Sequence, residues 1–519
     1  MHSHRTSQYS GYDPGRASLN NGDLSDDGDG PYNEQSRLLS GSASSPHTSG
    51  LNGSQQGVPD PQENSVEVDI VNEATATQNS IVTIFSMWNT MMGTSLLSMP
   101  WAIKQAGFVN GIVLLIVMAG IMAYTSYRVL NSGRLLAGRV VTEFSDVVRV
   151  FLGRFAEVGA LLCSLLTLLG GAIVYWILMS NFLYHIVVFI YSHVHQTDHH
   201  NTNSSSNYSH PQEAVPFTDV LCRNLTKSDD TLDSTFTKVW NETNTVPFFL
   251  VLILFPLLNF KSPTFFTKFN ALGTLSVTYL SIFVAVKAGE WGIHLDLNSD
   301  HSAAYNYAPA FEWSFPALTG IAALAYFLQN CVMAICRNQK HPENNTRDLI
   351  IAYVLVCLTY TYMGAVFFAA YPMAKSCIED NFLNNMASTD VMAFVARMGL
   401  FFQMMCVLPL LTYVFRAQLL HFLFRSVWPS VKHVLVLNLL IVGVCVIFAV
   451  FMPKIGHIIS FVGAFCGFSY AIAFPCTVYL VACYRDGSLT VPKLVFHGAL
   501  IALGLANFVA QFVIIGHTS

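Results

Sequence analysis

The chain has 519 residues, of which 53% are hydrophobic and only 11% carry a charge. Soluble domains typically contain about 25% charged residues, so the composition excludes an ordinary soluble protein and indicates a chain that lies mostly in lipid. The sequence contains no Walker loop, nucleophile elbow or HExxH pair, and we expect neither an enzyme nor a nucleic-acid-binding protein.

The first 79 residues are rich in Ser, Asn, Gly, Asp and Pro, and they carry 11 acidic against 3 basic side chains. Such a segment buries too little apolar surface to offset chain entropy, so residues 1–79 are predicted to be a disordered cytosolic tail. Within the tail, the run EQSRLL is similar to an acidic dileucine sorting signal for lysosomes, built on Glu34, Leu38 and Leu39. Six-residue patterns of this kind also occur by chance.

Residues 80–516 are predicted to form a transmembrane domain, because apolar runs of ~20 residues recur there and each gives ~30 Å of helix. Eleven spans are expected, at 80–103, 110–130, 156–191, 246–260, 265–289, 315–336, 349–371, 390–415, 433–451, 456–483 and 492–516. The predicted fold class is therefore an all-α polytopic membrane protein with 11 transmembrane helices. The third span is longer than a bilayer requires, so it should tilt or project beyond the lipid.

The positions of the basic residues orient these spans. With a cytosolic N-terminus, fifteen basic residues in loops and at helix ends fall on the cytosolic side and seven on the opposite side. This satisfies the positive-inside rule and makes the C-terminus lumenal. Asn-x-Ser/Thr acceptors agree, since four of them cluster in the 192–245 loop, which is then lumenal and glycosylated. They begin at Asn203, Asn207, Asn224 and Asn241.

Two cysteines lie outside the spans. Cys222 and Cys377 fall in loops that come out on the same non-cytosolic side, whereas the other nine cysteines lie within spans. That compartment is oxidising, so a disulfide between the two is expected. Two free loop thiols are the alternative.

The first span is the most informative segment, because its centre interrupts an apolar run with small and polar residues. Gly93 tolerates unusual backbone torsions, and the neighbouring polar residues are Asn89, Thr90, Thr94, Ser95 and Ser98. Unwinding here would expose amides that attract a carboxylate and carbonyls that attract an ammonium group, as in many secondary transporters. The alternative is a small-residue face on which another helix packs.

Spans 1–5 and 6–10 have opposite orientation, because five is an odd number. This predicts a 5+5 inverted repeat plus one extra helix, with a matching break somewhere in span 6. That span has no internal proline, only Pro316 and Gly320 near its start and Gln329 and Asn330 later. No span contains a carboxylate in its interior, so a cationic side chain would have to be held by carbonyls, amides or aromatic faces. Lys287 and Arg397 are expected to snorkel or to pair at an interface.

The runs WNTMMGTSLLSMPW at 88–101 and IKQAGF at 103–108 closely resemble the sodium-coupled neutral amino acid transporter family, of the amino acid/auxin permease type. Further matches are VYWILMSNFL at 174–183, LLNFKSP at 257–263, CIEDNFL at 377–383 and FQMM at 402–405. The likeness covers residues 80–516 and is strongest to the lysosomal, arginine-sensing branch. It implies a leucine-transporter-like fold, residence in the lysosomal or late endosomal membrane, and amino acid transport.

This resemblance also implies site residues. Arginine would contact Thr90, Met91, Met92, Gly93, Thr94 and Ser95. Asn89 would help bind sodium, and Cys222 would bridge to Cys377. Cys406 stands where the family places a threonine near the sodium site, and a thiol is a poor ligand for a hard cation.

The primary hypothesis is an alternating-access carrier that moves arginine or neutral amino acids such as leucine and glutamine. The alternative is an amino acid receptor that signals lysosomal arginine to Rag GTPases, Ragulator and the TOR kinase complex. In the arginine-sensing branch a tyrosine-rich tail segment contacts those partners, whereas residues 40–79 here contain no aromatic residue.

Overall fold

The computed structural model describes residues 78–134, 144–196, 219–222, 234–260, 271–298, 304–426 and 428–518. Within these ranges every regular secondary-structure element is a helix, and the few β-type contacts are isolated bridges. Seven helical segments are long and apolar enough to cross a membrane. They are 108–132, 154–194, 342–370, 391–424, 431–451, 455–485 and 491–513. The prediction of an all-α polytopic membrane protein is confirmed at this level.

The described helices divide between the two halves of the chain. The N-terminal half contains α2 (Ser80–Met91), α3 (Ser95–Ala106), α4 (Phe108–Arg134), α5 (Phe144–Leu152), α6 (Arg154–Gln196), α7 (Ser234–Val239), α8 (Val246–Leu258) and α10 (Ala271–Trp291). The C-terminal half contains α11 (Pro316–Ala325), α12 (Val332–Arg337), α13 (Asn345–Ala370), α14 (Val391–Phe424), α15 (Val431–Phe451), α16 (Ile455–Cys466), α17 (Phe474–Arg485) and α18 (Val491–Thr518).

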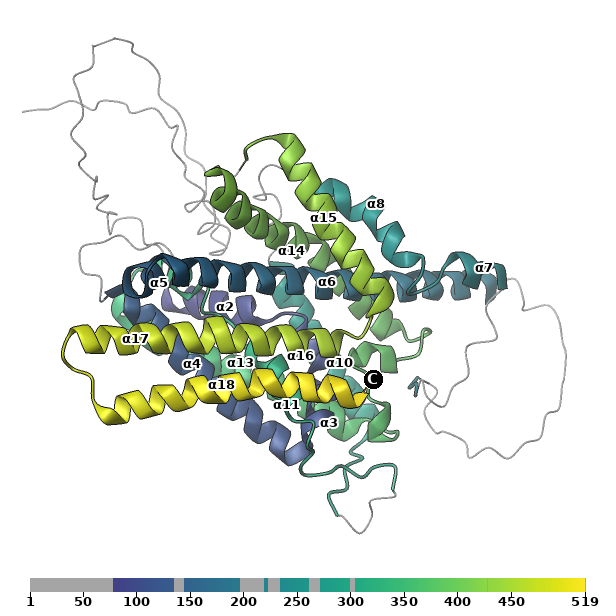
Figure 1. The fold of residues 1–519 in the computed structure, drawn as a ribbon. Coiled ribbons are helices and arrows are strands. Elements are labelled where there is room, and N and C mark those ends of the chain that lie inside the picture. Colours follow the sequence, from purple (N-terminus) through teal and green to yellow (C-terminus); the bar gives the residue numbers. More distant parts are fainter. Residues whose placement is uncertain are drawn as a thin grey trace, which may run out of the picture.

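The long helix α6 runs through the middle of the molecule (Figure 1). It has 43 residues, or about 64 Å at ~1.5 Å per residue, so the expected extra length of the third span is confirmed. On one side it packs against α14, α15 and α8, and on the other against α16. Helices α16–α17 and α18 form an antiparallel pair beside it (Figure 1).

Two local features differ from the sequence expectation. Helix α5 lies where only a cytosolic loop was expected, and it buries Phe144, Val147, Val148 and Phe151 along one face. That spacing is the amphipathic helical pattern of a short surface helix. The tenth span is also not a uniform α-helix, because a π-helical segment, Gly467–Ala473, separates α16 from α17.

Helices α11 and α16 approach each other through glycines. A Cβ atom on Gly463 would overlap the carbonyl oxygen of Gly320, and one on Gly320 would overlap the carbonyl oxygen of Ser460. Side chains larger than hydrogen would therefore force the helix axes apart. This close contact fixes the position of α11, which belongs to the site described below.

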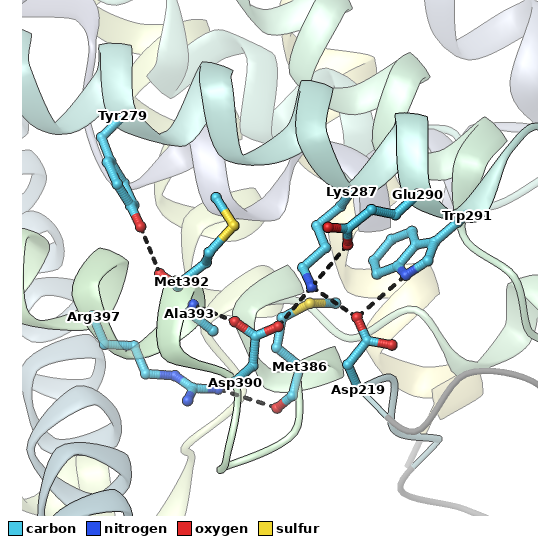
Figure 2. A network of polar contacts seen from close by, with 10 residues as sticks. All are labelled: Asp219, Tyr279, Lys287, Glu290, Trp291, Met386, Asp390, Met392, Ala393 and Arg397. Carbon is cyan, nitrogen blue, oxygen red and sulfur yellow. Dashed lines mark hydrogen bonds and ion pairs between the residues drawn. The ribbon is translucent and has the colours of Figure 1, made fainter.

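A buried ion cluster joins α10, α14 and the segment before Cys222 (Figure 2). The Lys287 ammonium lies 2.7 Å from the carboxylates of both Asp219 and Asp390, and 3.3 Å from Glu290. Asp390 also caps α14 by accepting from the amide of Ala393 at 2.7 Å. Of the two expectations for Lys287, snorkelling or pairing, the structure shows pairing.

Arg397 differs from the expectation that it snorkels or pairs at an interface. It is completely buried, and its guanidinium donates to the carbonyl oxygens of Leu383 at 2.7 Å and Met386 at 3.2 Å. The 382–386 segment lies against the N-terminal end of α14, so the carbonyl groups of Leu383 and Met386 reach Arg397 inside the protein.

Candidate substrate site

The first span is interrupted at its centre. Helix α2 ends at Met91 and α3 begins at Ser95, and the residues between, Met92 to Thr94, are not helical. A Cβ atom on Gly93 would lie no closer than 4.0 Å to any neighbouring atom, so close helix packing does not explain this glycine. Of the two interpretations from the sequence, the break agrees with an unwound helix centre rather than a packing face.

The sixth span contains the expected second break. Helix α11 ends at Ala325, α12 begins at Val332, and Tyr326 to Cys331 are not helical. The buried Gln329 satisfies a backbone amide within this break, because its Oε1 accepts from the amide of Leu328 at 3.0 Å. Its Nε2 donates to Thr125 Oγ1 at 3.0 Å, which ties the break to α4.

Helix α13 holds both breaks through two buried tyrosines. The Tyr360 hydroxyl donates to the Met91 carbonyl oxygen at 2.5 Å and lies 3.4 Å from that of Ala325. The Tyr353 hydroxyl donates to the carbonyl oxygen of Tyr326 at 2.9 Å. The two tyrosines are seven residues apart, or about two helical turns, so they share one face of α13. In lipid an unpaired carbonyl has no water to bond, so these hydroxyls stabilise the interrupted backbone.

A cavity of about 310 Å³ lies beside the first break. All six residues expected to contact the substrate line it, together with Asn89. Its other wall includes Thr167 to Tyr175 on α6 and Gln403 to Gln418 on α14. These stretches belong to the N-terminal part of α6 and the C-terminal part of α14, so the cavity extends toward one end of the molecule.

The cavity wall carries no ionisable carboxylate, ammonium, guanidinium or imidazole among its described residues. Polar contacts come instead from hydroxyls, amides and the helix ends at the break, with Tyr175, Phe327 and Tyr470 as aromatic surface. Ligand pockets range from about 300 to 1,000 Å³, so this one suits a small molecule. Helix ends can hold the carboxylate and ammonium of a zwitterion without fixed counter-charges.

Asn89 is fixed by a contact that the sequence did not reveal. Its Oδ1 accepts from Thr274 Oγ1 on α10 at 3.2 Å. Gly273 permits this approach, since a Cβ atom there would lie 3.1 Å from Asn89 Oδ1 and 3.0 Å from Gln403 Nε2. Cys406 is not among the residues that line the cavity, whereas its neighbour Val407 is. Sodium binding at Asn89 and Cys406 stays a prediction.

Comparison with known proteins assigns the family. The model of the family described as transmembrane amino acid transporter protein matches residues 76–209 and 224–515. The chain belongs to this family. It is 44% identical over 449 residues to neutral amino acid transporter 9 of Rattus norvegicus, covering 83% of this chain and 79% of the relative. It is 45% identical over 457 residues to the Xenopus tropicalis protein of that name, covering 85% and 81%.

A third relative is the sodium-coupled neutral amino acid transporter 9 homolog of Caenorhabditis elegans. It is 44% identical over 457 residues, which cover 84% of this chain and 74% of that protein. The resemblance drawn from the sequence motifs is confirmed. The chain is a multi-pass membrane protein of an amino acid transporter family, and that family indicates transport rather than enzyme catalysis.

The other predicted site residues are the disulfide cysteines, the glycosylation acceptors and the sorting signal, and the structure describes only some of them. The structure joins Cys222 and Cys377 by a disulfide, with Cα atoms 5.2 Å apart and a sequence separation of 155. Asn241 folds back on its own acceptor sequence, since its Oδ1 accepts from the Thr243 amide at 3.1 Å and hydroxyl at 3.2 Å. The other acceptors and the sorting signal lie outside the described residues, namely Asn203, Asn207, Asn224, Glu34, Leu38 and Leu39.

Proposed function

We propose that this protein carries arginine or neutral amino acids across the lysosomal or late endosomal membrane by alternating access. The observation that carries the proposal is the interrupted first helix, which lines an uncharged cavity of amino acid size. Membership of an amino acid transporter family supports the substrate class. The dileucine-type signal at 34–39 supports the lysosomal location.

We further propose eleven crossings in a leucine-transporter-like 5+5 arrangement with one extra helix. The broken first and sixth spans support this, because inverted repeats place matching breaks at their common interface. With the N-terminus cytosolic, the central cavity faces the cytosol, since it follows the N-terminal part of α6 and the C-terminal part of α14. The opposite end, with the disulfide and the 192–245 loop, is then lumenal.

Flux through purified protein in proteoliposomes tests the function. Thr94 lines the cavity at the break, and Thr94→Trp should abolish amino acid flux because an indole fills the space that the substrate needs. Leu439→Trp is the matched control, since Leu439 is 56% exposed on α15 and its replacement leaves the cavity intact. Equal flux in the two variants and in wild type would remove the first break from the transport path.

Sodium coupling is a separate proposal. It is supported by the name of the worm relative and by two neighbouring side-chain oxygens, Asn89 Oδ1 and Thr274 Oγ1, which lie 3.2 Å apart. Replacing sodium by choline should lower the flux of wild type, and Asn89→Ala should remove that dependence. Cys406→Thr should strengthen it if residue 406 faces the ion, because a hydroxyl is a better ligand for a hard cation than a thiol. Unaltered sodium dependence in this variant would exclude Cys406.

A further inference from the structure

A second cavity, of about 370 Å³, lies next to the central one along α6, and the segment that follows the disulfide-bonded Cys377 forms part of its wall. Its walls come from α6, the start of the 242–245 turn, the segment that follows Cys377, and the junction between α15 and α16. Its polar lining includes Ser180, Asn181, Glu242, Glu379, Asp380 and Lys454. Its volume is within the ~300–1,000 Å³ range of small-molecule sites.

The two cavities follow each other along α6. Tyr175 lines the central cavity and Ser180 lines the second one, and five residues correspond to about 7.5 Å of helix. A solute that leaves the second cavity toward the protein interior therefore needs to travel only a short distance to reach the broken helix.

The charges on the walls distinguish the two cavities. The central cavity has no charged side chain among its described lining residues, whereas the second has the carboxylates of Glu242, Glu379 and Asp380 against the single ammonium of Lys454. Within the described ranges, no three His, Cys, Asp or Glu side chains converge closely enough to hold a metal ion. Three carboxylates in one cavity wall attract a cation, and an organic ammonium or guanidinium group can make such contacts without metal coordination.

Two further cations lie behind this wall. Lys104 interacts electrostatically with Glu379 and Asp380, but its ammonium donates to the carbonyl oxygens of Ser376 and Ile378. Arg397 interacts electrostatically with Glu242, and its guanidinium donates to backbone carbonyls as well. Neither side chain lines the cavity, so carboxylates outnumber cations three to one among its described lining residues.

Two carboxylates of the wall accept hydrogen bonds from neutral amide groups. The Asn181 side-chain amide donates to Glu242 Oε1 at 2.7 Å, and Asn181 Oδ1 in turn accepts from Asn381 at 3.1 Å. An amide fixes a carboxylate without neutralising its charge, so Glu242 keeps its attraction for a cation. Asp380 is fixed similarly, because its Oδ2 accepts from the amide of Gly456 at the start of α16, at 2.9 Å.

An independent observation also points to a ligand. Ser180 is only 3% exposed, and its hydroxyl has no hydrogen-bond partner among the described residues. Buried hydroxyls are nearly always hydrogen-bonded, so one left unpaired beside a cavity indicates a missing partner.

We propose that this second cavity binds amino acids with a cationic side chain before they enter the central site. The carboxylates contact the guanidinium or ammonium group, so selection for positive charge takes place here and not at the uncharged central cavity. The inference deepens the proposed function and rests on it for the direction of movement. Binding itself does not depend on transport, so the two can be tested apart.

The test is equilibrium binding of radiolabelled L-arginine to the purified full-length Thr94→Trp protein, whose central site is blocked. L-citrulline is the matched neutral probe, since it has nearly the shape of arginine without the charge. We expect Thr94→Trp to retain arginine binding and to bind citrulline weakly. Adding Glu242→Gln or Glu379→Gln should weaken arginine binding about tenfold, the worth of one charge-assisted hydrogen bond.

Glu290→Gln is the control, because it removes a carboxylate at the same end of the molecule but outside the cavity. Equal affinity for arginine and citrulline, or equal effects of the cavity and control variants, would overturn the proposal. If Thr94→Trp fails to fold, the number of arginine molecules bound per chain of the wild-type protein tests the proposal instead. The proposal is supported if wild type binds two arginine molecules per chain and the Glu242→Gln/Glu379→Gln double variant binds one. It is contradicted if wild type and the double variant each bind one. Absent flux with retained two-site binding would instead count against the proposed function alone.

Discussion

The hydroxyl of Tyr360 lies 2.5 Å from the carbonyl oxygen of Met91, the last residue of the first half-helix. The same hydroxyl is 3.4 Å from the carbonyl oxygen of Ala325, where the other broken helix ends. One side chain on α13 thus contacts both interruptions of the chain. A shift of α13 relative to either half-helix would change both ends together, which is what a carrier needs when its two repeats move.

The first prediction concerns this tyrosine. Tyr360→Phe should lower stability by about 1–3 kcal/mol, because it leaves the Met91 carbonyl unpaired in a buried place. It should also weaken amino acid binding, since the end of α2 forms part of the cavity wall. Thermal unfolding and equilibrium binding in detergent measure the two effects.

Tyr362→Phe is the control for that variant. Tyr362 lies on the same helix and donates to the carbonyl oxygen of Ser281 on α10, away from both breaks. It should lose stability with unchanged ligand affinity. If both variants changed affinity equally, Tyr360 would have no particular role at the site.

The second prediction concerns the contact between α11 and α16. Gly463→Ala should lower stability by about 1–3 kcal/mol, because the new methyl group overlaps the Gly320 carbonyl and separates the helices. Gly443→Ala on α15 meets only open space and should leave stability unchanged or slightly higher. Unfolding midpoints compare the two, and equal midpoints would show that the close contact is unimportant.

The third prediction concerns the ion cluster of Figure 2. Lys287→Met should destabilise by about 3–5 kcal/mol, because it leaves Asp219 and Asp390 close together without a cation. Adding Asp219→Asn to that variant should recover part of the loss. Glu290→Gln should cost at most about 1 kcal/mol, since its carboxylate is half exposed. A double variant no more stable than Lys287→Met would mean that charge repulsion is not the cause.

The fourth prediction concerns pH. Burial lowers the pKa of Lys375 to about 7, although its ammonium donates to the carbonyl oxygens of Phe368 at 2.7 Å and Tyr371 at 2.8 Å. Because the unfolded chain binds this proton up to pH ~10.5, stability should rise by about 1 kcal/mol per pH unit from pH ~7 upward. Below pH ~7 the lysine is protonated in both states and this contribution is constant.

Lys375→Met isolates that effect. The gain in unfolding midpoint between pH 7 and pH 9 should be larger in wild type than in this variant, since only wild type loses a buried charge over that range. The same gain in both proteins would show that Lys375 titrates at its ordinary pKa.

The sequence predicts the first break well, because Gly93 and several hydroxyl residues stand out in an otherwise apolar run. It predicts the second break only through repeat symmetry, since span 6 has no internal proline and the break depends on Gln329 contacts with α4. It also predicts the disulfide partners, because topology places both loops on one side.

Other parts of the site could not be predicted because they depend on tertiary contacts. Tyr360 and Tyr353 lie in an apolar helix whose pattern does not show that they bond to distant carbonyls, although their spacing of seven residues hints at a shared face. The contact of Thr274 with Asn89 depends on how closely α10 approaches α2, which Gly273 decides. The π-helical segment leaves no composition signal at all.

The most direct test is a density map of the full-length protein in lipid nanodiscs with a saturating amino acid. We predict ligand density beside Met92, Gly93 and Thr94, with the first span interrupted there and Tyr360 in contact with the end of α2. A continuous first helix, tightly packed against its neighbours and without ligand density beside the glycine, would contradict the central claim.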